Sequence, residues 1–525
     1  MVGARSAQFT QCCGPRKGQG QFAAETTGGE IAQFHQLSCL GGGECADSFW
    51  VHDRETITPS DARAAGRDQT DVRPPTNVGA TGLPLNLIED ILMRTVVAAG
   101  QATTLEVAER MHCSSPIIDS VVQSLRDRGL IEYRGMVGLS YVLAATDAGG
   151  HYSIRRSTEC RYVGPLPVPL EQYSPVVRAQ TPQLFLNQDK LTRAFSDLVI
   201  SPELIDQLGP AICGDGAIFL YGPPGTGKSS IAERLIRAYE DTVLIPYCLE
   251  VQGQIITVFD PVTHEPVAEQ PRDIDRRWVL CQRPAVIAGG ELHLGMLDLA
   301  LDADVGTYSA PLQLKANNGI FVIDDFGRQA MTPEQMLNRW IIPLDRQVDY
   351  LTLIGRKFQV PFEVKVTLST NLSPEALGDE AFFRRIHNKV YIGCMTDQQF
   401  DWVLARVAKA KKIGVTADAA VRLRQVTRGH GDGELRAYLP GVVCKLATAI
   451  CRYEGIPVRL TPELVDRVLD LYFAKTDSPA APAQAPERAH VEKRPKAMGP
   501  VAAAPPLPMT TADLPPELAG KQAAV

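Results

Sequence analysis

The sequence predicts an α/β fold: a parallel sheet with helices on both faces. Three segments carry this prediction: an apolar strand over residues 217–221 that leads into a glycine-rich loop and a helix, an apolar strand over 320–323 that ends in two aspartates, and a strand over 364–368 followed closely by Asn371. Short apolar strands that alternate with helical segments are typical of parallel sheets covered on both faces. The segments on either side of this core predict one smaller domain each.

The composition is that of an ordinary globular protein. The chain has 525 residues, of which 45% are hydrophobic and 22% charged, and a formal net charge of −7. This length accommodates two or three domains, and the charge indicates neither nucleic acid nor an anionic membrane as the main partner. We find no signal-peptide pattern and no apolar run of about 18 residues, so we expect no membrane association and a cytoplasmic protein.

Cysteine and histidine spacing predicts no metal site. None of the 12 cysteines lies in a C-x-x-C pair, so we expect buried, reduced thiols, which fits a reducing cytosol. His264, His293 and His387 are isolated in the sequence, and we interpret them as structural or surface residues.

The N-terminal third predicts an arm and then a small domain. Residues 1–82 are rich in Gly, Gln, Ser, Thr and Ala without a hydrophobic period, so we expect a disordered arm. Over residues 83–162 the pattern predicts helix, helix, turn, helix and hairpin, with a cap at Thr103 or Thr104 and another at Ser114 or Ser115. The stretch TTLEVAERMHCSSPIIDSVVQSLRDRGLIEYRG resembles winged-helix domains of bacterial regulators.

Winged helices read DNA through their third helix, or serve as protein-contact modules or spacers. The third helix here offers Asp119, Ser120 and Gln123 outward and few basic residues. Phosphate contacts need more Lys and Arg than this, so DNA is a weakly supported partner.

The rest of the chain divides by composition. Residues 163–187 are proline-rich and predict a stiff linker. Residues 188–395 predict the α/β core, residues 396–475 a small helical lid, and residues 476–525 an Ala/Pro-rich disordered tail.

The loop GPPGTGKS, residues 222–229, matches the G-x-x-x-x-G-K-[ST] phosphate-binding pattern in its strand–loop–helix context. Glycines let backbone N–H groups face phosphate oxygens, and the helix N-terminus adds a partial positive charge. Lys228 is predicted to reach the β- and γ-phosphates, and Ser229 to ligate Mg²⁺. We therefore predict binding of ATP and Mg²⁺ by Gly222, Pro223, Pro224, Gly225, Thr226, Gly227, Lys228, Ser229 and Ser230.

The strand GIFVI ends in Asp324 and Asp325. Ligands of open α/β sheets bind at the carboxyl ends of the strands. Asp324 is predicted to hold Mg²⁺ together with Ser229. Asp325 is predicted to orient or deprotonate the attacking water.

Together with VKVTLSTN, LGDEAFFRRI and GELRAYLPGVV, these motifs are ordered as in the AAA+ ATPases, and the resemblance covers residues 188–473. It implies a P-loop core with a C-terminal helical lid. It also implies that Asn371 is the polar sensor, that Arg384 or Arg385 reaches the nucleotide of a neighbouring subunit, and that Arg436, opening a helix, is the second sensor. A ring, such as a hexamer, would follow. Many relatives carry Glu where this chain has Asp325.

Longer stretches, among them VQGQIITVFDPVTHEPV and LQLKANNGIFVIDDFGRQ, resemble a family of largely uncharacterised bacterial AAA+ ATPases, some described as chaperone-type. The resemblance implies ATP hydrolysis that remodels a protein or protein complex. Two alternatives stay open: a DNA-directed ATPase, regulator or loader that uses the winged helix, and a nucleotide-gated scaffold with little turnover, for which Asp325 is the hint.

Two further segments refine the expectation. About 70 residues, including QIITVFD and RWVLC, separate the second core strand from Asp324, where many AAA+ branches insert substrate-contacting elements. The segment YLTLIGRKFQVPFEVKV predicts a hairpin with Gly355 and Arg356 at its turn. Such a hairpin acts on a polymer in a central pore or is purely structural.

Overall fold

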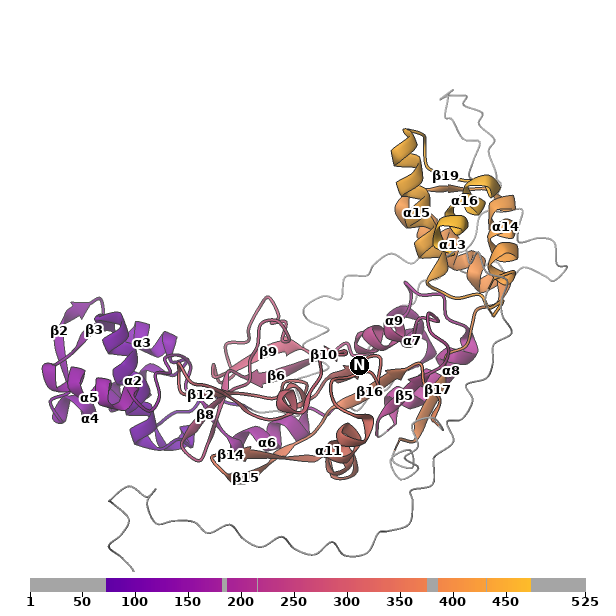
Figure 1. Ribbon diagram of the computed structural model, residues 1–525. Coiled ribbons are helices and arrows are strands. Elements are labelled where there is room, and N and C mark those ends of the chain that lie inside the picture. Colours follow the sequence, from indigo (N-terminus) through magenta and orange to yellow (C-terminus); the bar gives the residue numbers. More distant parts are fainter. Residues whose placement is uncertain (1–71, 182–186, 215, 375–385, 431, 474–525) are drawn as a thin grey trace, which may run out of the picture. The chain divides into compact units, whose positions relative to one another are not determined.

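The computed structural model in Figure 1 describes residues 72–181, 187–214, 216–374, 386–430 and 432–473. The predicted disordered arm falls outside these residues up to residue 71, but residues 72–82 are described and include a short 3₁₀ turn, η1 (Gly79–Thr81). The predicted tail, residues 476–525, lies outside the described residues.

The core is a five-stranded sheet whose strands all run parallel, in the order β10-β13-β16-β5-β17. Its strands are β5 (Ile218–Tyr221), β10 (Ala285–Ala288), β13 (Ile320–Ile323), β16 (Lys365–Thr370) and β17 (Asn388–Tyr391). Along β13, Ile320 and Val322 enter one hydrophobic cluster while Phe321 and Ile323 enter another. Both faces of the sheet are therefore buried, as the apolar strands predicted.

Helices cover each face. One face packs against α7 (Gln188–Ala194), α8 (Pro202–Cys213), α9 (Lys228–Arg234) and η2 (Leu235–Ala238). The other packs against η3 (Leu294–Leu297), α10 (Leu312–Lys315) and α11 (Pro333–Arg346). On α11, Met336, Leu337 and Trp340 recur at helical spacing and point into this cluster, and a Thr332/Gln335 capping box fixes the start of the helix.

The N-terminal domain combines helices with a three-stranded antiparallel sheet in the order β1-β3-β2. Its elements are α2 (Leu85–Ala99), β1 (Gln101–Thr103), α3 (Thr104–Arg110), α4 (Ser115–Asp127), β2 (Ile131–Val137), β3 (Ser140–Ala145) and α5 (Asp147–Ser157). The predicted cap at Thr103 is present as a capping box with Glu106. Ser114 precedes α4 but does not cap it, because its hydroxyl donates to the Pro75 carbonyl at 3.3 Å.

A second β-rich body, here called the β-module, consists of eight elements. They are β4 (Val168–Pro169), α6 (Leu170–Ala179), β6 (Thr242–Pro246), β7 (Cys248–Val251), β8 (Gln254–Thr257), β9 (Trp278–Gln282), β11 (Ala300–Asp302) and β12 (Thr307–Ser309). They form a five-stranded sheet, β11-β12-β8-β7-β4, and the antiparallel pair β6-β9 around one core, with α6 packed into it.

Two expectations are corrected by the β-module. The expected linker, residues 163–187, contains β4 and α6, whose Tyr173 and Val177 are buried in the module's core. The second core strand, expected about 70 residues before Asp324, is not found there, because the apolar strand in that region, β6, pairs with β9 outside the core sheet. β10 takes that place instead, so most of the inserted segment lies before the second strand rather than after it.

The predicted hairpin is present as β14 (Val348–Leu353) and β15 (Arg356–Pro361). Ile354 (φ 48°) and Gly355 (φ 76°) form its two-residue turn, whereas Arg356 already pairs in the strand. Two successive positive φ angles match the twist of a tight hairpin. Leu351, Leu353, Phe358 and Val360 are buried in the core of the β-module. This face of the hairpin is therefore structural.

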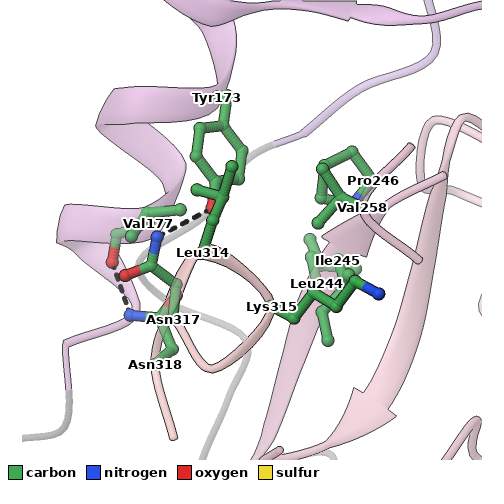
Figure 2. A pocket seen from close by; sticks show the side chains of 10 residues that line it. All are labelled: Tyr173, Val177, Leu244, Ile245, Pro246, Val258, Leu314, Lys315, Asn317 and Asn318. Atoms are coloured by element: carbon green, nitrogen blue, oxygen red, sulfur yellow. Dashed lines mark hydrogen bonds between the residues drawn. The ribbon is translucent and has the colours of Figure 1, made fainter. Parts of the chain in front are cut away.

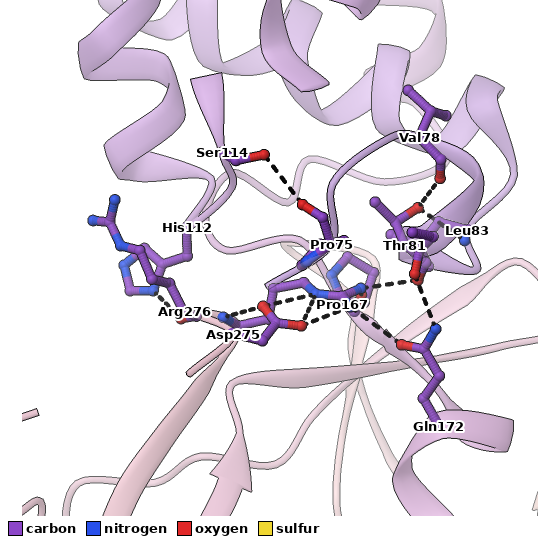
Figure 3. Close-up of polar contacts among 12 residues, drawn as sticks. Pro75, Val78, Thr81, Leu83, His112, Ser114, Pro167, Gln172, Asp275 and Arg276 are labelled. Carbon is purple, nitrogen blue, oxygen red and sulfur yellow. Dashed lines mark hydrogen bonds and ion pairs between the residues drawn. The ribbon is translucent and has the colours of Figure 1, made fainter. Parts of the chain in front are cut away.

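The N-terminal domain and the β-module share a hydrophobic cluster, to which β7 contributes Cys248 and β8 contributes Ile255. Polar contacts that involve Thr81, Gln172 and Asp275 also connect the two bodies (Figure 3). Arg277 pairs with Asp275 at 2.8 Å and donates to the carbonyls of Thr81 at 3.0 Å and Pro167 at 3.2 Å. The Gln172 side chain also accepts from Arg277, at 3.1 Å.

The C-terminal part of the described chain is helical. It comprises α13 (Asp397–Lys411), α14 (Ala417–Arg428), α15 (Leu439–Glu454) and α16 (Pro462–Tyr472), with a small parallel pair, β18 (Gly414–Val415) and β19 (Arg459–Leu460). A Thr396/Gln399 capping box starts α13 close to the boundary that the sequence predicts.

Candidate functional site

The glycine-rich loop lies between β5 and α9, and its glycines adopt backbone conformations that other residues rarely adopt. The φ angles of Gly222, Gly225 and Gly227 are 142°, 78° and 99°. A Cβ on Gly222 would also stand 2.3 Å from the Ile392 carbonyl oxygen, which is far inside contact distance. Glycine is therefore required for the curvature of the loop as well as for the packing of its first residue.

Lys228, at the start of α9, is buried (5% exposed) and turned back onto the loop. Its Nζ donates to the carbonyl oxygens of Gly222 at 3.0 Å and Pro223 at 2.6 Å. Burial lowers the pKa of Lys228, and the nearby carboxylates of Asp324 and Asp325 oppose this shift. The positive charge thus lies between the loop and the aspartate pair.

The other loop residues differ in burial. Thr226 is buried, and its hydroxyl donates to the Pro223 carbonyl at 3.1 Å. Pro224 is exposed. Ser229 and Ser230 are half-buried in the first turn of α9, directly after Lys228.

Asp324 follows the last residue of β13, and one of its carboxylate oxygens, Oδ1, is buried without a hydrogen-bond partner. A buried carboxylate oxygen normally has a donor or a cation beside it. An oxygen ligand with free lone pairs is what Mg²⁺ prefers. Asp324 therefore fits the predicted metal ligand.

Asp325 and Asn371 meet at the carboxyl ends of neighbouring strands. The Asn371 side-chain amide donates to Asp325 Oδ1 at 3.2 Å. Asp325 is exposed and has φ 49°, an uncommon angle for a residue other than glycine. Because β16 lies between β13 and β5, Asn371 emerges between the aspartate pair and the phosphate loop. The structure thus brings together three segments that are distant in sequence.

The predicted arginines have different outcomes. Arg384 and Arg385 lie outside the described residues. Arg436 does not open a helix as predicted, because α15 begins at Leu439 and Arg436 lies in the preceding segment. Its guanidinium pairs with Asp432. Burial raises the pKa of the nearby Cys394, and Arg436 opposes this shift.

Sequence reasoning missed two residues beside the site. Gln329 holds the turn after β13: its amide donates to the carbonyl of Asp324 at 2.9 Å and accepts from Gly327 N–H at 2.8 Å. Tyr438 borders the phosphate loop, since its N–H donates to the Gly225 carbonyl at 3.4 Å. Both residues lie inside the quoted stretches LQLKANNGIFVIDDFGRQ and GELRAYLPGVV, but neither stretch predicted a role for them.

The start of β13 is tied to the β-module. Asn317 donates to the Tyr173 hydroxyl at 2.9 Å and Asn318 to the Val177 carbonyl at 2.7 Å, and both partners belong to α6 (Figure 2). The cavity beside them measures about 10 Å³, room for a single water at most. It is not a ligand site. Within the described residues, no group of three or more His, Cys, Asp or Glu side chains could hold a metal ion.

A glycine-rich loop between a strand of a parallel sheet and the helix that follows it is the arrangement of a P-loop NTPase fold. The model of a domain of unknown function, DUF8689, matches residues 396–471. No curated protein matches the chain. No helix in the described part of the chain is long and apolar enough to cross a membrane.

Solved structures similar to this chain include NtrX from Brucella abortus in complex with ADP. The two share 16% identity over 55% of this chain, with a TM-score of 0.35, and the match covers 60% of the NtrX chain, less than two thirds. The Thermotoga maritima RuvB Holliday junction branch migration motor shares 13% identity over 56% of this chain and 72% of its own, with a TM-score of 0.31. Identities this low concern the fold alone.

Proposed function

We propose that this chain is a Mg²⁺-dependent AAA+ ATPase that couples ATP hydrolysis to the remodelling of a protein or protein complex. One observation carries the proposal: Lys228, the free Oδ1 of Asp324 and the Asp325–Asn371 pair converge at the carboxyl ends of three adjacent parallel strands. A cation, an acceptor for a metal and a polar pair for a water molecule are the groups that phosphoryl transfer needs.

Each side chain has a distinct role in this proposal. The loop amides and Lys228 bind the phosphates, so Lys228 must release the carbonyls of Gly222 and Pro223. Asp325 accepts a proton from the attacking water, and Asn371, already bonded to Asp325, orients that water. Mg²⁺, held by Ser229 and Asp324, would supply charge neutralisation between the phosphates.

Arg384 or Arg385, from a neighbouring subunit, would stabilise the transition-state charge, and Arg436 would act as the second sensor. This arrangement requires an oligomer, which we propose to be a ring such as a hexamer. Release of Arg436 from Asp432 would be part of that role. We propose the cytoplasm as the location.

We propose that the N-terminal domain is a winged helix that contacts protein rather than DNA. On α4, the exposed Arg126 lies over the Tyr133 ring, and the partner of Arg128 is Glu89. The tip of the β2–β3 hairpin is apolar instead of basic: Val137 is 64% and Leu139 98% exposed. An apolar tip favours a protein surface over a phosphate backbone.

Steady-state ATPase activity against protein concentration tests the proposal. Turnover per subunit should rise with concentration, and Lys228→Ala and Arg384→Ala/Arg385→Ala should each lose about 10³-fold or more in kcat. Lys190→Ala, which changes a half-buried lysine of α7 that pairs with Glu240, is the matched control and should keep full activity. ATP binding without turnover would instead support the nucleotide-gated scaffold. Asp325→Glu should then restore hydrolysis.

A further inference from the structure

A second polar cavity lies where the N-terminal domain meets the β-module. It measures about 70 Å³, which is space for roughly five water molecules. Its walls include Arg94 of α2, Arg156 of α5, Cys160, and Gly253 and Gln254 at the β7–β8 turn. The cavity therefore has residues of both bodies in its wall, and none from the phosphate loop.

Arg94 is a buried cation (5% exposed) whose bonds go to neutral groups. Its Nε donates to the Tyr162 carbonyl at 3.0 Å and its Nη1 to the Cys160 carbonyl at 2.7 Å. Among the described residues, Nη2 has no hydrogen-bond partner, and this nitrogen keeps some accessible surface. Arg94 is thus a guanidinium with a free donor at a cavity wall.

The carboxylates in the same wall are satisfied by another arginine. Asp90 accepts from Tyr152 Oη at 2.7 Å and from two nitrogens of Arg156, at 2.9 and 2.6 Å. Glu159 pairs with the remaining Nη1 of Arg156 at 2.9 Å and is 71% exposed, so solvent screens its charge. Two carboxylates share Arg156, and no carboxylate of the described residues is at ion-pair distance from Arg94.

A buried charge with no carboxylate at ion-pair distance is unfavourable. Desolvation lowers the pKa of Arg94, and the Asp90 carboxylate, which is bonded to Arg156, opposes this shift without cancelling it. A small anion in the cavity would relieve this cost. A planar guanidinium favours oxyanions, because its parallel N–H groups match their geometry. A tetrahedral oxyanion also fits a space of this size.

We propose that this cavity is a binding site for a small oxyanion such as inorganic phosphate, held by Arg94. Bound there, the anion contacts α2 on one side and the β7–β8 turn on the other, so its occupancy fastens the N-terminal domain to the β-module. The site is independent of the proposed ATPase activity.

Equilibrium dialysis with labelled inorganic phosphate tests the site in the Lys228→Ala chain, in which the phosphate loop is disabled. We expect about one phosphate per chain. Arg94→Met should weaken binding by about tenfold or more, and Arg94→Lys less, because it keeps the charge but not the planar fork. Arg110→Met, at an exposed arginine of α3, should have no effect.

Cys160 supplies a readout that needs no change in the cavity. Its free thiol lines the site, so bound phosphate should slow its alkylation, measured by mass spectrometry, in the Lys228→Ala chain. Absence of phosphate binding to that chain would overturn the inference, as would binding that leaves Cys160 alkylation unchanged. Phosphate binding by the unaltered chain alone would place the anion at the phosphate loop, which overturns this inference and supports the proposed function.

Discussion

Replacing Arg277 with methionine should loosen the junction between the N-terminal domain and the β-module. Arg277 and Asp275 are each 2% exposed, and their side chains are joined at 2.8 Å. Methionine keeps most of the apolar stem but removes the guanidinium. Asp275 then retains the bond from the backbone N–H of residue 277, at 3.0 Å, and the carbonyls of Thr81 and Pro167 lose a donor.

Breaking a buried ion pair from one side costs about 3–5 kcal/mol, because it leaves an uncompensated charge. If local opening governs amide exchange, protection should fall roughly 10²- to 10⁴-fold. Hydrogen exchange followed by mass spectrometry on peptides covering residues 72–83 and 165–173 measures this directly. The neighbouring Arg276→Met, at an exposed arginine, is the matched control and should leave exchange unchanged.

A second substitution separates charge from packing. In the Arg277→Met chain, Asp275→Asn removes the carboxylate that has lost its guanidinium partner. It should therefore recover a large part of the lost protection against amide exchange. Exchange in Arg277→Met within about threefold of the unaltered chain would refute this reasoning, since it would mean that the hydrophobic cluster alone holds the junction.

Three further outcomes follow from local contacts. Thr103→Ala removes the cap of α3 and should cost about 1 kcal/mol in urea unfolding, whereas Ser114→Ala, whose hydroxyl caps nothing, should cost less. Asn371→Ala removes the amide bonded to Asp325 and should lower kcat by about 10²-fold with an unchanged Kd for ADP; an equal loss in both would contradict an orienting role. Burial lowers the pKa of His264 below its usual 6.5, so the native state binds fewer protons than the unfolded chain. The stability from this histidine is therefore present above pH 6.5 and is lost as the pH falls below that value. Melting temperatures across this range should fall less steeply for His264→Gln, and parallel curves would exclude the histidine as the cause.

The core elements were predictable because their signals are local. The loop GPPGTGKS contains its own turn residues. The five residues IFVID indicate a strand buried on both faces and also mark its carboxyl end. The motifs gave Asp325 and Asn371 separate roles and predicted no contact between them, although parallel strands do bring their carboxyl ends to one edge of the sheet. The α/β fold class was therefore predictable from the sequence, and the roles of the site residues stay predictions.

The errors arose where distant pairing decides the structure. Two apolar segments, residues 242–246 and 285–288, are equally compatible with a strand of the core sheet. The first lies outside that sheet because it pairs with the antiparallel strand β9. The expected linker was misread because prolines dominate it. Yet Tyr173 and Val177, four residues apart, were a helical signal, and Pro169 is compatible with the cap position that it takes before α6.

The four-residue strand β13 is fixed at both ends, so its length cannot change without moving one of them. Asn317 and Asn318 are anchored to α6 just before it, and Asp324 follows directly after it. One residue inserted into β13 would turn each following side chain of the strand to the opposite face of the sheet. It would also shift the carboxylates of Asp324 and Asp325 away from the phosphate loop. By contrast, Val262 is 94% exposed in the turn between β8 and β9. Changes in length during evolution should therefore accumulate around Val262 and avoid residues 317–325.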